Sequence, residues 1–261
     1  MKELFETILY QPIFNIFVGL YNIIPDVGVV IIIITVIIKL ALYPLTKSSI
    51  VAQKSMTDLQ PKLNALKEKY KDDKQALAQE TMKLYKENKV NPLGSCLPVL
   101  IQLPIFLAIY WVLREGLTTE NFDGLYSFVN NPGKINTISF GIMDLGQRSI
   151  LFAVLAGASQ FWQAKMMQSK KPPKEAGDGG KDEGMMSMMN KQMLYFMPGL
   201  TFIIGLKFPG GLALYWFLST FLTALQQKIT FDKQKKKESA SEMSMAEKPA
   251  NVKKIELNKD K

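Results

Sequence analysis

The chain has 261 residues, of which 48% are hydrophobic and 21% charged, and its formal net charge is +9. It contains no histidine, which excludes His-rich zinc sites and catalytic sites of the Ser-His-Asp or Cys-His type, and its single Cys96 cannot form an internal disulfide. The hydrophobic residues are gathered in blocks instead of recurring at a helix or strand period, which predicts an all-α membrane protein. We expect no enzymatic activity, no cofactor and no bound metal.

Residues 1–26 combine apolar side chains on a broad helical stripe with the acidic Glu3 and Glu6, and Pro12 interrupts the stripe. Such a pattern is typical of an amphipathic helix that lies in the membrane interface. An additional, poorly inserted span is the alternative. Because acidic residues follow Lys2 and no small-residue cleavage site ends the segment, it does not look like a secretory signal.

The first clear span is predicted over residues 27–45, which are rich in Ile and Val and end at Tyr43 and Pro44. This stretch is long enough to cross a hydrocarbon core of about 30 Å. In residues 46–91, Lys and Glu are spread among apolar residues spaced by three and four. We therefore expect two amphipathic helices that form a helical hairpin outside the bilayer, with the turn at residues 71–74.

The second span is predicted over residues 92–113, where Pro98 and Pro104 require neighbouring groups to satisfy the freed backbone carbonyls. Residues 114–148 contain Gly, Asn and Pro and are expected to form an extracytoplasmic loop with short helical pieces. The third span is predicted over residues 149–167.

Small residues such as Gly157 and Ser159 lie in the middle of the third span and permit close helix packing. A polar cytoplasmic loop is expected over residues 168–191. The apolar blocks within residues 192–226 predict spans four and five, although a re-entrant pair would return the chain to the same side. The Lys-rich residues 227–261 are expected to be a basic cytoplasmic tail that is disordered in large part.

Lys and Arg residues are concentrated on one side of the predicted spans. Ten lie in residues 46–91, six in residues 165–192 and ten from residue 227 onward, which is 26 of the 32 in the chain. By the positive-inside rule these segments face the cytoplasm, so the N-terminus is expected outside and the tail inside. Because orientation accounts for the basic charge, we expect no DNA partner.

Lys39 lies within the first predicted span, where burying a lysine in hydrocarbon costs roughly 2.5–3.5 kcal/mol. Snorkelling of its side chain to the cytoplasmic interface is one outcome.

No Asp or Glu lies inside any predicted span, and each clear span carries polar side chains on one face. Ordinary hydrogen bonds between helices, worth about 0.6 kcal/mol each, are one explanation of these polar stripes. We infer instead a water-filled hollow, where a cation without a counter-ion attracts polar or acidic segments. The polar positions are Thr35 in the first span, Asn91, Ser95 and Gln102 at the second, Gln160 and Gln163 in the third, and Tyr215, Ser219, Thr223 and Gln226 in the last.

Five ordered segments resemble the YidC family of insertases, with its mitochondrial Oxa and chloroplast Albino relatives. The resemblance covers roughly residues 15–230. It implies a five-span core in a bacterial plasma membrane, with a groove open to the cytoplasm and to lipid. It also implies insertion and folding of membrane proteins, alone or with the Sec translocon. The five segments are residues 35–46 (TVIIKLALYPLT), 59–62 (LQPK), 89–94 (KVNPLG), 100–106 (LIQLPIF) and 208–216 (FPGGLALYW).

The resemblance implies roles for single residues. Lys39 matches the groove cation, which is Arg in most bacterial members. The positive charge is therefore kept, but the guanidinium group that can form two parallel hydrogen bonds to one partner is lost. Thr35, Tyr215 and Trp216 match positions implied to contact the substrate helix, and Gln160 is a weaker match. The predicted substrate-binding groove consists of Thr35, Lys39, Gln102, Gln160, Tyr215, Trp216 and Ser219.

The implied partners are nascent membrane proteins and the lipid bilayer, with the Sec translocon and the ribosome as further candidates. A ribosome contact would use the basic tail on RNA phosphates, whereas topology and attraction to the membrane surface explain the same charge. Many Gram-negative members carry a large extracytoplasmic domain and a lipoprotein-type signal that this sequence lacks, so we expect the natural N-terminus to lie upstream.

Two other functions are alternatives to insertion. A small anion transporter or channel would use Lys39 as its binding charge, but such transporters carry internal repeats with broken helices, and the sequence shows no such symmetry. An intramembrane hydrolase is weaker still, because no histidine and no carboxylate within a span can serve as the base.

Overall fold

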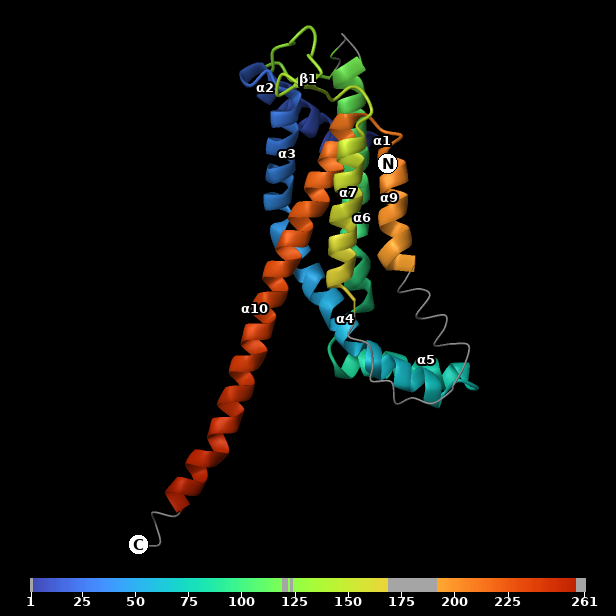
Figure 1. The fold of residues 1–261 in the computed structure, drawn as a ribbon, viewed down its shortest axis with the longest axis vertical. Helices are drawn as coiled ribbons and strands as arrows, with labels where there is room; N and C mark the ends of the chain where they lie inside the picture. Colours follow the sequence, from blue (N-terminus) through green and yellow to red (C-terminus); the bar gives the residue numbers. More distant parts are fainter. Residues whose placement is uncertain (1, 119–121, 123, 169–191, 257–261) are drawn as a thin grey trace.

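The computed structural model describes residues 2–118, 122, 124–168 and 192–256 (Figure 1). Nearly all of the regular structure is helical, which confirms the all-α prediction, and one two-stranded sheet is the exception. Apart from residue 168, the loop expected at residues 168–191 lies outside the described residues. In chain order the elements are α1 (Lys2–Phe5), the π-helical η1 (Glu6–Tyr10), α2 (Gln11–Ile23), α3 (Val27–Ala41), α4 (Tyr43–Lys69), α5 (Lys74–Glu87), α6 (Pro92–Thr118), β1 (Ile138–Ser139), β2 (Met143–Asp144), α7 (Ile150–Met166), the π-helical η2 (Gln192–Phe196), α9 (Met197–Gly205) and α10 (Gly210–Glu256).

An upright bundle is formed by α3, α6, α7, α9 and the first part of α10 (Figure 1). The loop with β1 and β2 covers the upper end of this bundle, and α5 lies crosswise below its lower end. By length and composition, Glu3–Ile23 and Leu97–Gly116 can cross a membrane, and α3 with α4 would be a third span if this bent pair is counted as one. Of the five predicted spans, only those at α6 and at the bent pair α3–α4 are among these candidates; α7, with 17 residues, and α9, with 9, are shorter, and α10 is not among the candidates. The total of five spans therefore stays a proposal.

The N-terminal helix lies across the upper end of the bundle and contacts both α3 and α6 (Figure 1). Its buried face presents Phe14, Phe17 and Val18 to the bundle, whereas Leu4 and Ile8 remain exposed. The predicted interruption at Pro12 takes the form of the π-helical turn η1, which ends just before it, and not of a break in the helix. A crosswise helix with an exposed apolar side supports an interfacial position, although its length would also suffice for a span.

A bend of 67° separates α3 from α4 at Leu42. Pro44 lies in the first turn of α4, where its missing N–H is tolerated, whereas in an uninterrupted helix its ring would clash with the carbonyl of Leu40. The straight helix therefore ends at Ala41 and not at residue 45, where the first span was predicted to end. After the bend, α4 continues away from the bundle toward α5, and Asp73 caps the start of α5 by accepting from the backbone N–H of Ala76 at 2.9 Å.

The loop after α6 holds a short antiparallel pair, β1 with β2, in which Ile138 lies opposite Asp144. We expected short helical pieces here, and the described part of the loop beyond Thr118 contains turns and this pair instead. Asp26 fastens the pair to the start of α3: its carboxylate accepts from the Ser139 hydroxyl and, at 2.7 Å, from the Phe140 backbone N–H. Within the loop, the Asn136 and Asp144 side chains each accept from the backbone N–H two residues further on, and local bonds of this kind favour turns over helix.

Helices α9 and α10 run in opposite directions along α7 and are joined by a turn at residues 206–209 (Figure 1). This arrangement favours two antiparallel helices over a shallow re-entrant pair. Beyond the bundle, α10 continues as helix to Glu256, so the expectation of a largely disordered tail was wrong. The tail is rich in Lys, Glu, Ala and Met, all good helix formers, and it extends a helix that is already nucleated.

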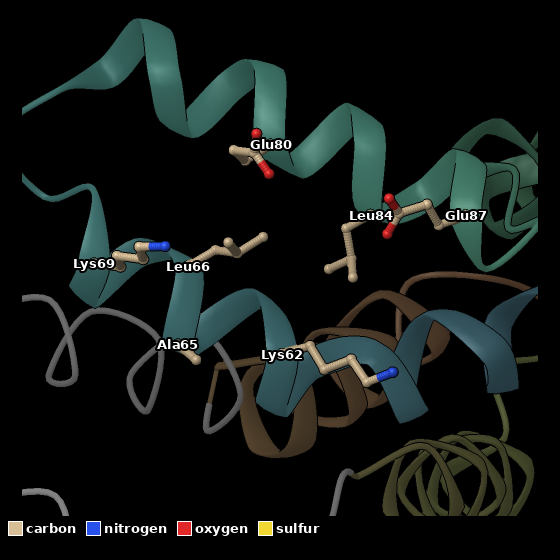
Figure 2. Close-up of a pocket in the computed structure, with 7 residues that line it drawn as sticks. All are labelled: Lys62, Ala65, Leu66, Lys69, Glu80, Leu84 and Glu87. Carbon is tan, nitrogen blue, oxygen red and sulfur yellow. The ribbon is translucent and has the colours of Figure 1, made fainter.

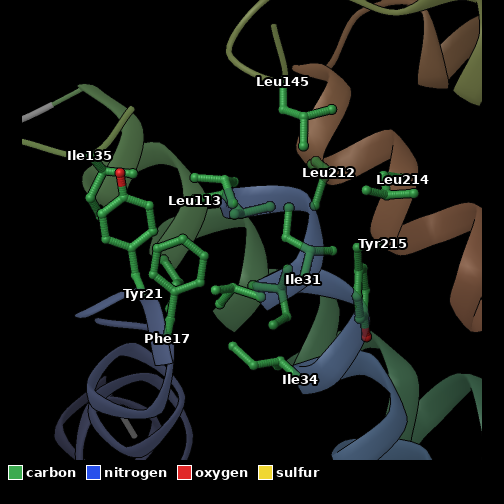
Figure 3. Packing of buried hydrophobic residues seen from close by; sticks show 14 of the residues in the cluster. Phe17, Tyr21, Ile31, Ile34, Leu113, Ile135, Leu145, Leu212, Leu214 and Tyr215 are labelled. Atoms are coloured by element: carbon green, nitrogen blue, oxygen red, sulfur yellow. The ribbon is translucent and has the colours of Figure 1, made fainter. Parts of the chain in front are cut away.

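The apolar core lies in the upper half of the bundle, between α2, α3, α6 and α10 (Figure 3). Phe17 and Tyr21 reach it from α2, Ile31 from α3, and Leu212 from α10. Other large apolar side chains point outward, such as Val99 on α6, which is 68% exposed. An outward apolar surface made of many such side chains would be a liability in water but suits contact with lipid. Its members include Val99, Leu100, Leu103 and Leu107 on α6, Ile150, Leu151 and Val154 on α7, and Tyr195, Phe196 and Ile203 at η2 and α9.

We expect Gly157→Leu to destabilise the bundle and Gly199→Leu, its matched control, to be tolerated. A Cβ at Gly157 would lie 3.2 Å from the Pro198 carbonyl oxygen, at the contact of α7 with α9, whereas nothing lies within 4 Å of a Cβ at Gly199. Overpacking of this kind costs about 1–3 kcal/mol. Thermal unfolding of the purified protein in detergent measures this loss of stability. Equal unfolding temperatures for the two variants would contradict the close packing of α7 against α9.

Asp26→Ala should lower the unfolding temperature at neutral pH, and its effect should fade in acid. Burial would raise the pKa of the Asp26 carboxyl, but hydrogen bonds from Ser139 and from the backbone N–H groups of Phe140 and Val29 outweigh this and lower that pKa. A depressed pKa contributes stability above the ordinary aspartate value of ~3.9 and loses it as pH falls through the folded value. Unfolding scans between about pH 7 and pH 3 test this. Asp72→Ala, in the exposed turn before α5, is the control and should leave the unfolding temperature at neutral pH unchanged.

Candidate functional site

Lys39 brings three helices together at one point inside the bundle. From α3, its ammonium Nζ donates to Thr223 Oγ1 on α10 at 2.9 Å and to Gln102 Oε1 on α6 at 3.3 Å. The next residue along α3, Leu40, is 67% exposed on the outer surface. The Lys39 ammonium therefore points into the bundle, and the snorkelling alternative does not describe its position.

The hydrogen bonds continue from Lys39 into a wider polar network. Gln102 Nε2 donates to the Tyr215 hydroxyl at 2.8 Å, and this tyrosine is 1% exposed. The Ser219 side chain is also hydrogen-bonded to Tyr215, and the Thr223 hydroxyl donates to the Ser219 backbone carbonyl at 2.8 Å. Gln102 and Thr223 each accept from Lys39 and donate to a further group, so the lysine is held by a chain of polarised dipoles.

The partners of the Lys39 ammonium are neutral. Its hydrogen bonds go to an amide and a hydroxyl, and among the described residues no carboxylate forms an ion pair with it. A neutral acceptor offsets only part of the cost of desolvating a cation, because an opposite charge adds a direct Coulomb attraction that a neutral dipole lacks. The Lys39 ammonium would therefore bind more strongly to a better acceptor, such as a carboxylate or several backbone carbonyls.

The other predicted groove residues lie around this network in different ways. Thr35 is buried on α3, one turn from Lys39, and its hydroxyl donates to the Ile31 carbonyl of its own helix at 2.6 Å. Trp216 is half-buried and packs edge-on against Phe106 of α6, with ring centroids 5.2 Å apart. Gln160 is half-buried on α7, outside the Lys39 network. Their contact with a substrate remains a prediction.

Two contributors were not among the predicted groove residues. Thr223, which makes the shorter bond to Lys39, was recognised only as part of the polar stripe on the last span. Gln226, from the same stripe, is buried and donates from Nε2 to the Tyr43 carbonyl at 3.1 Å, which ties α10 to the bend between α3 and α4. The spacing of 219, 223 and 226 gives the helix face, but the rotation of α10 against α3 decides which of these residues meets the lysine.

The described residues contain no group of three or more Cys, Asp and Glu side chains placed to hold a metal ion. Lys39 and its two partners provide a cation, a hydroxyl group and an amide, which together can hold polar groups within an apolar surrounding.

The sequence matches the family model described as 60Kd inner membrane protein over residues 19–238. The chain belongs to this family. It is 36% identical over 224 residues to the membrane protein insertase YidC of Mannheimia succiniciproducens, and 34% identical over 230 residues to that of Actinobacillus pleuropneumoniae. These alignments cover 85% and 87% of this chain but only 36% and 37% of the relatives, so the chain spans about a third of their length.

A solved structure described as an active YidC insertase with its first transmembrane domain resolved has a similar fold. The TM-score is 0.52 at 24% sequence identity, and the match covers 85% of this chain and 45% of that one. Together with the family match, it confirms the resemblance that the five sequence segments indicated.

A thiol placed at residue 39 should be reached by water, and one at residue 40 should not. In a chain with Cys96 replaced by Ser, we expect Lys39→Cys in membranes to react with a charged, water-soluble thiol reagent, because only a hydrated thiol ionises. Leu40→Cys is the matched control: its side chain is more exposed in the structure but faces outward with the lipid-contacting residues. If both cysteines stay unreacted until detergent is added, the interior around Lys39 is dry.

Proposed function

We propose that this chain is a membrane protein insertase and chaperone, which places other proteins in the bilayer and helps them to fold. The observation that carries the proposal is the Lys39 ammonium, held inside an apolar bundle by a neutral amide and a neutral hydroxyl. The family membership and the insertase relatives support the same function.

The proposed mechanism is an exchange of hydrogen-bond partners. An incoming helix with a polar or acidic flank offers Lys39 a better acceptor than Gln102, whose contact at 3.3 Å is longer than the usual 2.9–3.0 Å. The flank stays solvated at Lys39 while the apolar part of the helix meets lipid, and burial of that part drives the reaction at about 25 cal/mol per Å². Release follows once the flank reaches water on the far side.

The substrate-binding groove is proposed to comprise the residues around Lys39 on α3, α6, α7 and α10. Within it, Tyr215 and Ser219 hold the polar network in place, and Trp216 with Phe106 offers an aromatic surface to the apolar part of a substrate helix. The full set is Thr35, Lys39, Gln102, Gln160, Tyr215, Trp216 and Ser219.

The proposed location is the bacterial plasma membrane, with the N-terminus outside and the C-terminus in the cytoplasm. The hairpin α4–α5 and the distal part of α10 extend from the lower end of the bundle, and residues 46–91 and the tail from residue 227 each hold ten basic residues (Figure 1). The positive-inside rule then places this end in the cytoplasm. The partners are nascent membrane proteins and the lipid bilayer, with the Sec translocon and, through the basic tail, the ribosome as further proposed partners.

Charge reversal at Lys39 tests the mechanism in reconstituted vesicles with a protease-protection assay of insertion. Lys39→Arg should retain insertion, whereas Lys39→Glu should reduce it about tenfold or more for substrates with acidic translocated flanks, because attraction becomes repulsion. Lys207→Glu, an exposed residue in the turn between α9 and α10, carries the same change in net charge and should insert normally. Equal insertion by Lys39→Glu and wild type for every substrate would falsify the electrostatic step.

Anion transport is the alternative function, because Lys39 could bind an anion by itself. Site-specific photocrosslinking separates the two. A crosslinker at Trp216 should capture a stalled nascent chain if the chain is an insertase, and one at the lipid-facing Val99 serves as the control. If the crosslinker at Trp216 captures no nascent chain and anions cross reconstituted vesicles, the result would favour transport.

A further inference from the structure

The helical hairpin holds a cavity of about 330 Å³ between α4 and α5 (Figure 2). Its middle is apolar, with Ala65 and Leu66 on α4 and Leu84 on α5. A cavity of this size is at the lower end of ligand-binding pockets. It can take one or two bulky side chains of a helix laid over it, and it is small for a large free ligand.

Charged residues flank this apolar centre in two layers. Lys62 and Lys69 lie on α4, seven residues apart, and Glu80 and Glu87 lie on α5 at the same spacing (Figure 2). Because the helices are antiparallel, one end of the cavity has Lys62 facing Glu87 and the other has Lys69 facing Glu80. Seven residues are two helical turns, so each pair lies about one turn from the apolar layer.

The two rows of opposite charge do not pair with each other across the cavity. Among the described residues, Glu80 forms its ion pair within α5, with Lys83 at 3.8 Å, and Lys69 lies over the Tyr70 ring of its own helix at 5.1 Å. No ion pair joins Lys62 to Glu87 in this part of the chain. The facing charges are thus close enough to line one cavity but are held apart by its width.

Within the described part of the chain, the apolar face of α5 is left uncovered. Helix α5 has the spacing of an amphipathic helix, yet none of its residues is buried. Two amphipathic helices alone bury little apolar surface, and the usual solution is a third helix laid in the trough between them. We propose that the trough between α4 and α5 docks an amphipathic helix of a partner protein that carries acidic residues along one edge and basic residues along the other.

The charges of the trough define this partner. Its apolar ridge inserts a bulky side chain against Leu66 and Leu84. Its acidic edge faces Lys62 and Lys69, and its basic edge faces Glu80 and Glu87, with the charges of each edge repeating every seven residues. A helix with acidic residues on both edges meets repulsion from α5, and a helix with basic residues on both edges meets repulsion from α4.

The test uses three designed helical peptides that share one apolar ridge and differ only in their edges: mixed, acidic on both sides, or basic on both sides. Binding to the full chain in detergent is measured by fluorescence anisotropy at low salt. We expect the mixed peptide to bind about tenfold more tightly than either of the others, and the difference to shrink in high salt, because exposed pairs are screened.

Charge reversal of one row should change which peptide is preferred. The double variant Lys62→Glu with Lys69→Glu makes both rows acidic and should prefer the peptide with two basic edges. Lys71→Glu with Lys74→Glu makes the same change in net charge outside the cavity lining and should keep the wild-type order. All the lining charges reversed here are exposed, so folding is not at risk.

Three results would overturn the proposal: no binding of the mixed peptide, equal binding of all three peptides, or an unchanged order in the variant reversed at residues 62 and 69. The last two would mean that peptides bind through apolar contact or net charge alone. Peptide docking is measured without any insertion reaction, so its failure and the failure of the insertase function are distinguishable.

Discussion

The Lys39 ammonium and its two neutral acceptors are the interaction around which this bundle is arranged. A lysine in hydrocarbon is costly, and the cost is offset here only if α6 and α10 both reach it with polar groups. Gln102 must then lie at the level of Lys39, and α10 must be rotated so that Thr223 faces α3. The rest of the upper bundle, with its apolar core, holds the three helices in that register.

The apolar core and the polar network divide the bundle along its length. On three helices the fully buried apolar cluster ends at Ile34, Ile105 and Tyr215. The polar residues lie close to these positions: Thr35 directly follows Ile34, Gln102 lies three residues from Ile105, and Ser219 lies four residues from Tyr215. The upper end is closed by packed side chains and by the loop fastened to Asp26, whereas the lower end holds the charge. Such a division suits a site that polar segments enter from the lower end of the bundle.

Much of this organisation could be predicted from the sequence, because each relevant signal is local. Blocks of apolar residues, the absence of carboxylates around Lys39 and the distribution of basic residues need no tertiary information. The partner Thr223 could not be chosen over its neighbours on the same stripe, because helix rotation is set by packing at a distance. The pair β1–β2 depends on a bond from Asp26 to Phe140, which are far apart in the chain. The helical tail could not be predicted from the low hydrophobicity of the residues after 227, because low hydrophobicity is also typical of disorder. The same residues nevertheless favour helix.

Two sets of charges in this chain share one physical feature, which is that neither is neutralised by an opposite charge across the space it faces. Among the residues that the structure describes, the acceptors of Lys39 are neutral, and the lysines and glutamates of the hairpin line a cavity without an ion pair across it. In both cases an added helix can supply the missing partner, so binding gains a charge-assisted bond without first breaking an ion pair. The hairpin lies beyond the lower end of the bundle and Lys39 lies within it (Figure 1). A polypeptide that approaches from that side would therefore meet unneutralised charges first at the hairpin and then at Lys39. An apolar surface lies beside the charges at both places.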